Sequence, residues 1–572
     1  MKKLKAGPIL LGYENGFLRR LSYGEHEVLR MIYFALRDHN WITINSTIRE
    51  ERIREGNDHF QVTYVRDEIV GESTVMTWDV RIEGKSDGTV VFAIAGEMLT
   101  DFSRNRAGFC VLHPLSVAGT ECVLHHEDDS RSVMRFPEEI APDDPFTHIK
   151  SMEWTISGTA FQLDFEGDLF ETEDQRNWGD ASFKTFCTPL DVPFPVTLTR
   201  GQKISQRIVF RPRQPLASLP APSGPVVLRP LDLPRIVPAL GLAASTQQAV
   251  PPTSVVSQLR AGRFNHYRAD VAPSDETWVR TFSNACEEAA SLGYPLEIAL
   301  HLSDNEDEEI EAFLMLCQQN RVRPRRVLVL SQGALVTKPR ALDAIQRLRN
   351  GLRNARIGAG TDFNFTEINQ NRFDGRRADF ISFSFSPQEH ASDDLTLLEN
   401  TETPAHMVRS AKTIFGPDVP VHISPVVLKR RYNPYAKDPA DWPIALKDQV
   451  DPRLGGNFGA VWTFAALCSF IRGGASAITL FQTWGDLGII SADGQTRPVF
   501  ETLKAFAAFQ GKGAIIMEST DPLAVQGVLL DGKVLAMANL SQEEKTVSWE
   551  NKTLRLEPRS VRYEKLDRSE HA

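Results

Sequence analysis

The chain has 572 residues, 42% of them hydrophobic and 24% charged, an ordinary composition for a soluble globular protein. Its formal net charge of −10 and pI near 5.8 give no electrostatic reason to expect nucleic acid or an anionic membrane as partner. No window approaches the ~18 apolar residues of a membrane-spanning helix. These numbers favour a neutral or sugar-like small molecule as the ligand, and the length indicates several domains.

The six cysteines are scattered, without a Cys-x-x-Cys pair or a zinc-finger spacing. We therefore expect reduced, mostly buried thiols in a cytoplasmic protein. Residues 1–12 begin with lysines and contain a short apolar run. Glycine and proline interrupt this run before it reaches the ~7–15 apolar residues of a signal peptide, so we expect that it is not one.

Residues 1–212 contain short runs rich in β-branched and aromatic residues, for example 59–65, 75–83 and 161–165. Turn signals such as Ser-Asp-Gly at 86–88 separate these runs. Many short strands at such spacing predict an antiparallel β-sandwich.

The amino-acid composition changes at residues 213–235, where prolines recur every few residues. Proline cannot donate to a sheet ladder and favours extended backbone, so we predict a proline-rich linker over this range.

At the C-terminal end of the chain, residues 513–572 again contain short apolar runs of strand length. An Asp-Gly turn at 531–532 between two apolar runs predicts a hairpin within a small C-terminal β-domain.

Residues 236–512 alternate apolar runs of strand length with helical stretches, which predicts parallel strands joined by helices. We expect eight strands, at residues 236–242, 263–271, 295–302, 326–331, 356–360, 379–386, 419–427 and 476–484. The helices between them include 402–415 and 457–472, each followed by a glycine. Eight strand–helix units in about 275 residues fit a (β/α)8 TIM barrel, for which roughly 250 residues is usual. An open doubly wound sheet is the alternative.

Side chains at the C-terminal ends of barrel strands face a common mouth, so residues far apart in sequence converge there. The predicted strands deliver several carboxylates, imidazoles and amides to this mouth. We predict a substrate-binding set made of Asp270, His301, Asp362, Asn364, Asn369, His422, Arg431 and Trp484. His422 is explained equally well as a satisfied histidine of the barrel interior.

Glu367, His390 and Gln482 are the predicted catalytic residues. Glu367 and His390 follow the fifth and sixth strands, and either side chain is a usable general base when it is partly desolvated. We expect Asp393 or Asp394 to orient the His390 ring. The sequence does not decide whether Glu367 or His390 is the general base.

A strand-end glutamate also suggests a (β/α)8 glycoside hydrolase, which needs a second carboxylate as its partner. The end of the eighth strand is the natural place for that partner, but Gln482 stands there. Glutamine is neither a glycosyl nucleophile nor a general acid. Gln482 and Asn369 are instead suited to hydrogen-bonding a carbonyl oxygen as it gains negative charge.

Six stretches along the chain resemble the D-apionate lactonase family of bacterial sugar catabolism. They lie at residues 16–21, 37–41, 108–114, 177–184, 365–369 (Phe-Thr-Glu-Ile-Asn) and 387–394. The resemblance spans essentially the whole chain and implies the same order of β-domain, barrel and small β-domain. It further implies hydrolysis of a five-membered sugar lactone, D-apionolactone or a close analogue, to the open acid. No motif in the chain indicates a metal or an organic cofactor, so we expect none.

The sequence thus supports three hypotheses. The first is a sugar lactonase in which a general base activates water. The second is a glycoside hydrolase acting on a plant-derived saccharide, and the third is a non-catalytic carbohydrate-binding relative.

Overall fold

The computed structural model describes residues 1–217, 219, 224–247 and 250–566, and the chain forms two compact units. The first unit consists of Met1–Gln175 and Ser182–Ser223. The second consists of Arg176–Ala181 and Gly224–Ala572. A six-residue segment from the N-terminal part of the sequence therefore folds with the C-terminal unit.

The first unit is an antiparallel β-sandwich, as predicted. One sheet has the order β1-β2-β3-β4-β9-β16-β15-β12 with β17 paired to β9, and the other has the order β11-β10-β13-β14-β18-β8-β7-β6-β5. The strands are β1 Lys2–Ala6, β2 Ile9–Glu14, β3 Phe17–Tyr23, β4 His26–Asp38, β5 Asn45–Glu55, β6 Phe60–Val70, β7 Ser73–Gly84, β8 Val90–Met98, β9 Phe102–His113, β10 Glu121–His125, β11 Arg131–Arg135, β12 Phe146–Ile149, β13 Ser151–Ile156, β14 Thr159–Glu166, β15 Phe170–Asp174, β16 Phe183–Cys187, β17 Val196–Leu198 and β18 Lys203–Pro212. Alternate side chains of both sheets meet in one core, where the rings of Phe34 and Trp78 lie edge to face at 5.4 Å.

The second unit contains a closed barrel of eight parallel strands, each at a predicted position. They are β21 Ala239–Ala243, β22 His266–Val271, β23 Leu296–Leu302, β24 Arg326–Ser331, β25 Arg356–Gly360, β26 Ile381–Phe385, β27 Val421–Val426 and β28 Ala477–Trp484. Neighbours in this order pair in parallel, and pairing of β21 with β28 closes the ring. A short strand, β29 (Gly488–Ile490), is added beside β28. The doubly wound alternative is therefore wrong.

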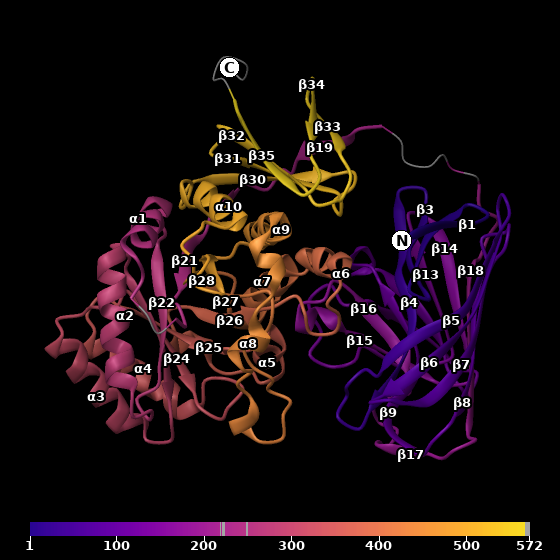
Figure 1. Ribbon diagram of the computed structural model, residues 1–572, viewed down its shortest axis with the longest axis horizontal. Coiled ribbons are helices and arrows are strands. Elements are labelled where there is room, and N and C mark those ends of the chain that lie inside the picture. Colours follow the sequence, from indigo (N-terminus) through magenta and orange to yellow (C-terminus); the bar gives the residue numbers. More distant parts are fainter. Residues whose placement is uncertain (218, 220–223, 248–249, 567–572) are drawn as a thin grey trace. The chain divides into compact units, whose positions relative to one another are not determined.

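Helices follow the strands, and Figure 1 shows α1 to α4 on the outside of the barrel. The helices are α1 Thr253–Gly262, α2 Trp278–Leu292, α3 Glu306–Gln319, α4 Pro339–Gly351, α5 Phe365–Gln370, α6 Asp394–Glu399, α7 Pro404–Phe415, α8 Leu446–Gln449, α9 Asn457–Gly473 and α10 Pro498–Ala507. Helix α9 is apolar on nearly all sides and is buried from Phe458 to Ile471. Such a helix needs cover on every face, which α7, α10 and strands of the C-terminal sheet provide.

The C-terminal sheet has the order β34-β33-β19-β30-β31-β32-β35, with β20 paired to β30. Its strands are β19 Val226–Pro230, β20 Arg235–Ile236, β30 Gly513–Ser519, β31 Val525–Leu530, β32 Val534–Asn539, β33 Lys545–Trp549, β34 Lys552–Leu556 and β35 Ser560–Lys565. The predicted hairpin is formed by β31 and β32. Residues 226–230, predicted to lie in the linker, instead form an inner strand of this sheet, because β30 and β33 supply its ladder partners.

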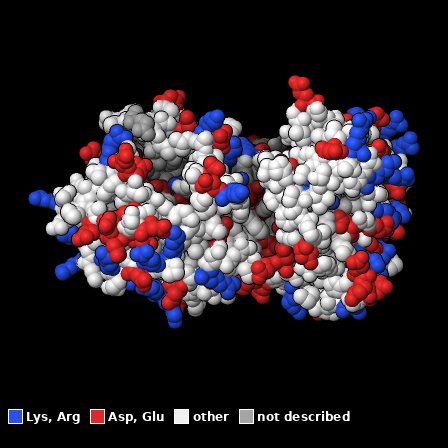
Figure 2. All heavy atoms as spheres, turned by 90° about the horizontal axis from the view of Figure 1, so that it is seen from below, with Lys and Arg blue, Asp and Glu red and all other residues white. Residues whose placement is uncertain are grey.

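Acidic and basic side chains are interspersed on the face drawn in Figure 2, with no extended basic surface there. None of the helices in the described residues has the length and hydropathy required to cross a bilayer. All six cysteines are free thiols, and five of them are buried.

Candidate active site

The barrel brings four of the predicted binding residues together at the C-terminal ends of its strands. Asp270 is on β22, His301 is on β23, Asp362 follows β25 and Arg431 follows β27. His301 Nε2 lies 3.0 Å from Asp270 Oδ1, and Arg431 contacts both carboxylates. With Arg268 of β22, these residues form what we call the mouth cluster.

Two guanidinium groups bridge the two carboxylates of the mouth cluster. Arg268 Nη2 donates to Asp270 Oδ1 at 2.8 Å and to Asp362 Oδ1 at 2.6 Å. Arg431 lies 3.2 Å from Asp270 Oδ2 and 3.2 Å from Asp362 Oδ2. Burial alone would raise the pKa of Asp270, but Arg268, Arg431 and the hydrogen bond from His301 outweigh it and hold this pKa well below its usual range. Asp270 is therefore ionised.

An ionised Asp270 fixes the tautomer of His301. The carboxylate only accepts, so we assign the ring proton to Nε2, which donates to Asp270 Oδ1. The lone pair on Nδ1 is then available to accept a proton. Gln332 donates to the backbone oxygen of His301 at 3.2 Å and supports the end of β23. This arrangement is a carboxylate–imidazole pair with an oriented base.

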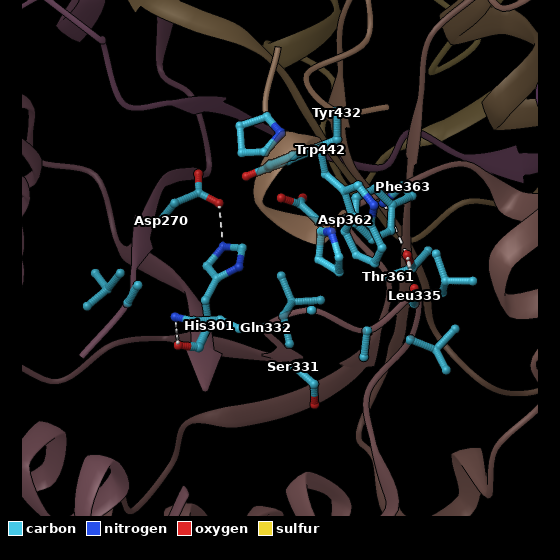
Figure 3. A pocket seen from close by; sticks show the side chains of 18 of the residues that line it. Asp270, His301, Ser331, Gln332, Leu335, Thr361, Asp362, Phe363, Tyr432 and Trp442 are labelled. Carbon is cyan, nitrogen blue, oxygen red and sulfur yellow. Dashed lines mark hydrogen bonds and ion pairs between the residues drawn. The ribbon is translucent and has the colours of Figure 1, made fainter. Parts of the chain in front are cut away.

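A cavity of about 630 Å³ lies beside this pair. It is lined by Asp270, His301, Ser331, Gln332, Asp362, Phe363, Tyr432, Trp442 and Pro443, among others. Figure 3 shows the His301 ring extending from β23 toward Asp270, with Asp362, Tyr432 and Trp442 around the same space. A second cavity of about 610 Å³ shares Asp270, Tyr432 and Pro443 with the first and adds Arg431 and Gln482.

The described residues contain one group with metal-ligand geometry, formed by Asp270, His301 and Asp362, whose ligand atoms lie within 4.8 Å of one another. All four oxygens of the two carboxylates already face a guanidinium group of Arg268 or Arg431. Two positive charges thus balance two negative charges. A divalent cation would have to displace the two arginines from the carboxylates, and their positive charges would repel it.

Below the mouth, a polar ladder fills the barrel interior. Arg326 pairs with Glu297 at 3.2 Å, and Ser424 connects Glu297 to Arg268. His422 is buried in this layer, stacked on a phenylalanine ring at 4.0 Å, and burial lowers its pKa to about 3. His422 is not among the described residues that line either cavity, so the interior explanation fits its position better than substrate binding.

Glu367 lies on α5, just beyond the mouth, and its pKa is raised to about 7. Burial is the largest cause, since the residue is 2% exposed, and the charge of Glu389 adds to it. The hydroxyl of Tyr435 lies 3.4 Å from Glu367 Oε1 and opposes the shift. Glu389 would be the second carboxylate of a glycosidase pair, but its Oε2 is bound to Arg430 at 2.7 Å.

His390 is oriented by Asp180, not by the predicted Asp393 or Asp394. Its Nδ1 lies 2.6 Å from Asp180 Oδ2. Asp393 instead caps α6 by accepting from the Thr396 amide, and Asp394 pairs with arginines. The prediction was wrong because Asp180 comes from the segment Arg176–Ala181, which no local pattern connects to the barrel.

Trp178 contacts His390 directly and is connected to Glu367 through Tyr435. Its indole meets the His390 ring edge to face at 5.7 Å and donates to the Tyr435 hydroxyl at 2.6 Å. We call these residues, Glu367, Tyr435, Trp178, His390 and Asp180, the Glu367 cluster. Neither Glu367 nor His390 is among the described residues that line the two cavities.

The other predicted residues are spread over both regions. Gln482 lines the second cavity, and its side-chain oxygen accepts from the Thr246 amide at 2.9 Å. Asn369 donates to Asn177 at 2.9 Å on the side of the Glu367 cluster. Asn364 precedes α5, and Trp484 is buried at the end of β28.

Sequence reasoning missed the aromatic wall of the first cavity. Phe363 meets Tyr432 at 5.4 Å and Trp442 at 5.3 Å, both edge to face. Tyr432 and Trp442 lie in the long connection after β27, and only its proximity to a strand end could have indicated them. Arg268 was visible two residues before Asp270 on the same strand face, but its bridging role needs Asp362 from β25.

Comparison with known proteins agrees with this architecture. The family model described as "D-apionate lactonase, N-terminal domain" matches residues 1–215, and the one described as "D-apionate lactonase, TIM barrel domain" matches residues 240–511. The chain belongs to the D-apionate lactonase family. A family member from Brucella anthropi, itself named D-apionate lactonase, is 29% identical over 571 residues, spanning 95% of this chain and 93% of the relative. The resemblance seen in the sequence is thereby confirmed.

Two solved structures are similar to part of this chain. A GH30 endoxylanase from Clostridium papyrosolvens C71 is 12% identical with a TM-score of 0.39, covering 59% of this chain and 98% of its own. A family 51 α-L-arabinofuranosidase from Bifidobacterium longum is 11% identical with a TM-score of 0.39, covering 60% of this chain and 95% of its own. At these scores neither similarity bears on the activity of a D-apionate lactonase family member.

Proposed function

We propose that the chain is a hydrolase that opens a five-membered sugar lactone, D-apionolactone or a close analogue, at the barrel mouth. Membership of the D-apionate lactonase family supports the reaction class. The observation that carries the proposal is the Asp270–His301 pair, 3.0 Å apart and lining a cavity of about 630 Å³. A cavity of this size accommodates a small sugar ring.

His301 is the proposed general base. Its Nδ1 accepts a proton from a water molecule, whose oxygen attacks the lactone carbonyl carbon, while Asp270 stabilises the imidazolium that forms. The carbon–oxygen ring bond then breaks. The same imidazolium returns its proton to the leaving ring oxygen, and the product carboxylic acid ionises at neutral pH. One base therefore serves both half-steps.

The developing oxyanion needs hydrogen-bond donors and positive charge. Tyr432 lines both cavities, and burial raises its pKa to about 12, which keeps the phenol protonated as a donor. Arg431 supplies the positive charge in the second cavity, and the side-chain amide of Gln482 supplies an N–H donor there. Removing one donor of this kind costs on the order of 10²–10³ in rate in other enzymes.

Glu367 and His390 were the predicted bases, but the cavities favour His301. A general base must come within hydrogen-bond reach of its water, directly or through one further water. His301 lines the first cavity, and Glu367 and His390 line neither of the two. In this proposal Glu367 and His390 support the surrounding loops and take no part in proton transfer.

Acid release from D-apionolactone, followed by pH-stat, tests the proposed function. We expect acceleration over spontaneous ring opening that saturates with substrate. A panel of five- and six-membered sugar lactones defines the ring preference, and aryl glycosides report the alternative glycosidase activity. Release of the aryl group with no lactone opening would replace the proposal with that alternative, and no turnover in either assay would favour a non-catalytic binding protein.

A further inference from the structure

The segment Arg176–Ala181 makes a dense set of side-chain contacts within the barrel unit. Asn369 donates to Asn177, Trp178 donates to Tyr435, and His390 and Asn400 contact Asp180, at distances of 2.9, 2.6, 2.6 and 3.2 Å. The Ala181 amide donates to Asn400 at 2.9 Å, and Arg176 lies 3.0 Å from His406. These contacts involve residues that follow β25, β26 and β27.

Gly179 allows this close approach. Its φ of +93° lies in the left-handed region, where side chains are disfavoured. A Cβ at this position would lie 2.9 Å from the Phe385 ring and 3.2 Å from the Ser386 backbone oxygen. The turn between Trp178 and Asp180 is thus fitted closely against the end of β26.

The contact with Tyr435 reaches the wall of the first cavity. Tyr435 is part of the connection at residues 431–444, which folds back on itself through hydrogen bonds from Ile444 N to Arg431 O (2.9 Å) and from Asn433 N to Trp442 O (2.7 Å). Tyr432, Trp442 and Pro443 of this 431–444 loop line the cavity. The tip of the loop carries Tyr435, which is 55% exposed.

We propose that Trp178 is a positioning residue, which holds the 431–444 loop by its hydrogen bond to Tyr435 and thereby sets the aromatic wall against which the sugar ring binds. This inference rests on the proposed function. Sugar C–H faces pack on aromatic rings, so the spacing between Tyr432, Trp442 and Phe363 determines which rings fit. The tether therefore acts on substrate binding, while proton transfer at His301 stays intact.

A double-mutant cycle on lactone hydrolysis tests the tether. Trp178→Phe keeps an aromatic ring and removes the N–H donor, and Tyr435→Phe removes the hydroxyl acceptor. We expect each variant to raise KM about two- to fivefold and to leave kcat within about twofold. The effect on KM is at the lower end of the range for losing one hydrogen bond, because Tyr435 is half-exposed. The double variant should match Tyr435→Phe, because Tyr435→Phe already removes the hydrogen bond to Trp178, together with the contact between the Tyr435 hydroxyl and Glu367. Trp41→Phe, the same change at an exposed site of the β-sandwich, should leave KM unchanged.

Hydrogen–deuterium exchange gives a readout that does not need turnover. We expect faster exchange of the amides at 431–444 in Trp178→Phe than in the wild type or in Trp41→Phe. Additive KM effects, a fall in kcat alone, or unchanged exchange would overturn the positioning role. If the wild type opens no lactone, the proposed function fails, and the exchange result alone still supports or overturns the tether.

Discussion

The mouth cluster and the Glu367 cluster contain the same kinds of side chain in opposite electrostatic settings. Each has a carboxylate–imidazole pair, Asp270 with His301 and Asp180 with His390. In the mouth cluster, two arginines keep Asp270 ionised beside a cavity. In the Glu367 cluster, burial raises the pKa of Glu367 to about 7.

This difference shows that residue type alone does not identify the base. A carboxylate–imidazole pair becomes catalytic only where the carboxylate is ionised and the ring faces a space for substrate. His301, the proposed base, meets both conditions, whereas His390 lines neither of the two cavities.

Asp270→Asn should have the largest effect. Loss of the charge removes the stabilisation of the His301 imidazolium, so we expect kcat/KM for the lactone to fall about 10²–10⁴-fold. Asp180→Asn, the same change beside His390, should cost less than about tenfold. Steady-state kinetics measure both, with circular dichroism confirming that each variant is folded. A larger loss in Asp180→Asn would move the chemistry to the Glu367 cluster.

Arg268→Met should destabilise the protein strongly. Arg268 is fully buried, and its removal takes away one of the two positive charges that balance Asp270 and Asp362. Breaking such a buried pair costs roughly 3–5 kcal/mol in free energy of unfolding. Arg207→Met is the matched control, because its ion pair with Glu166 is exposed and should contribute little. Equal urea midpoints for the two variants would contradict the bridging role.

Glu367→Gln should change how stability depends on pH. The folded-state pKa of about 7 lies above the ordinary 4.5, so the folded protein binds the proton more tightly and its free energy of unfolding falls as pH rises between these values. The amide removes this loss, so above pH 7 the variant should gain up to about 3 kcal/mol over the wild type, and near pH 4 it should gain little. Thermal melts at several pH values measure this, with Glu166→Gln as an exposed control. A gain that is the same at every pH would refute the raised pKa.

Chelation should have the smallest effect. Because arginines already balance the carboxylates of Asp270 and Asp362, we expect incubation with EDTA and removal of the chelator to leave lactone turnover within about twofold. A loss that added divalent metal restores would show that Asp270, His301 and Asp362 bind a cation in the working enzyme.

The sequence predicted the barrel well because runs of strand length, most of them rich in apolar residues, alternate regularly with helical stretches. It did not predict β19, because its partners β30 and β33 lie about 300 residues further along the chain. A Val-Val-Leu run in a proline-rich setting gives no local sign of such pairing.

The candidate site divides in the same way. Asp270 and His301 could be predicted because strand ends meet at the barrel mouth. The partner of His390 could not, since Asp180 reaches it from the segment Arg176–Ala181, more than 200 residues earlier in the chain. The two arginine bridges likewise depend on side-chain directions that periodicity does not give.

Side-by-side kinetics of His301→Gln and His390→Gln on D-apionolactone test the central claim most directly. Glutamine keeps a polar side chain at each position and removes the imidazole base. Our account predicts a loss of about 10²–10⁴-fold in kcat for His301→Gln and less than about tenfold for His390→Gln. The reverse order, or equal small losses in both, would contradict the assignment of His301 as the base.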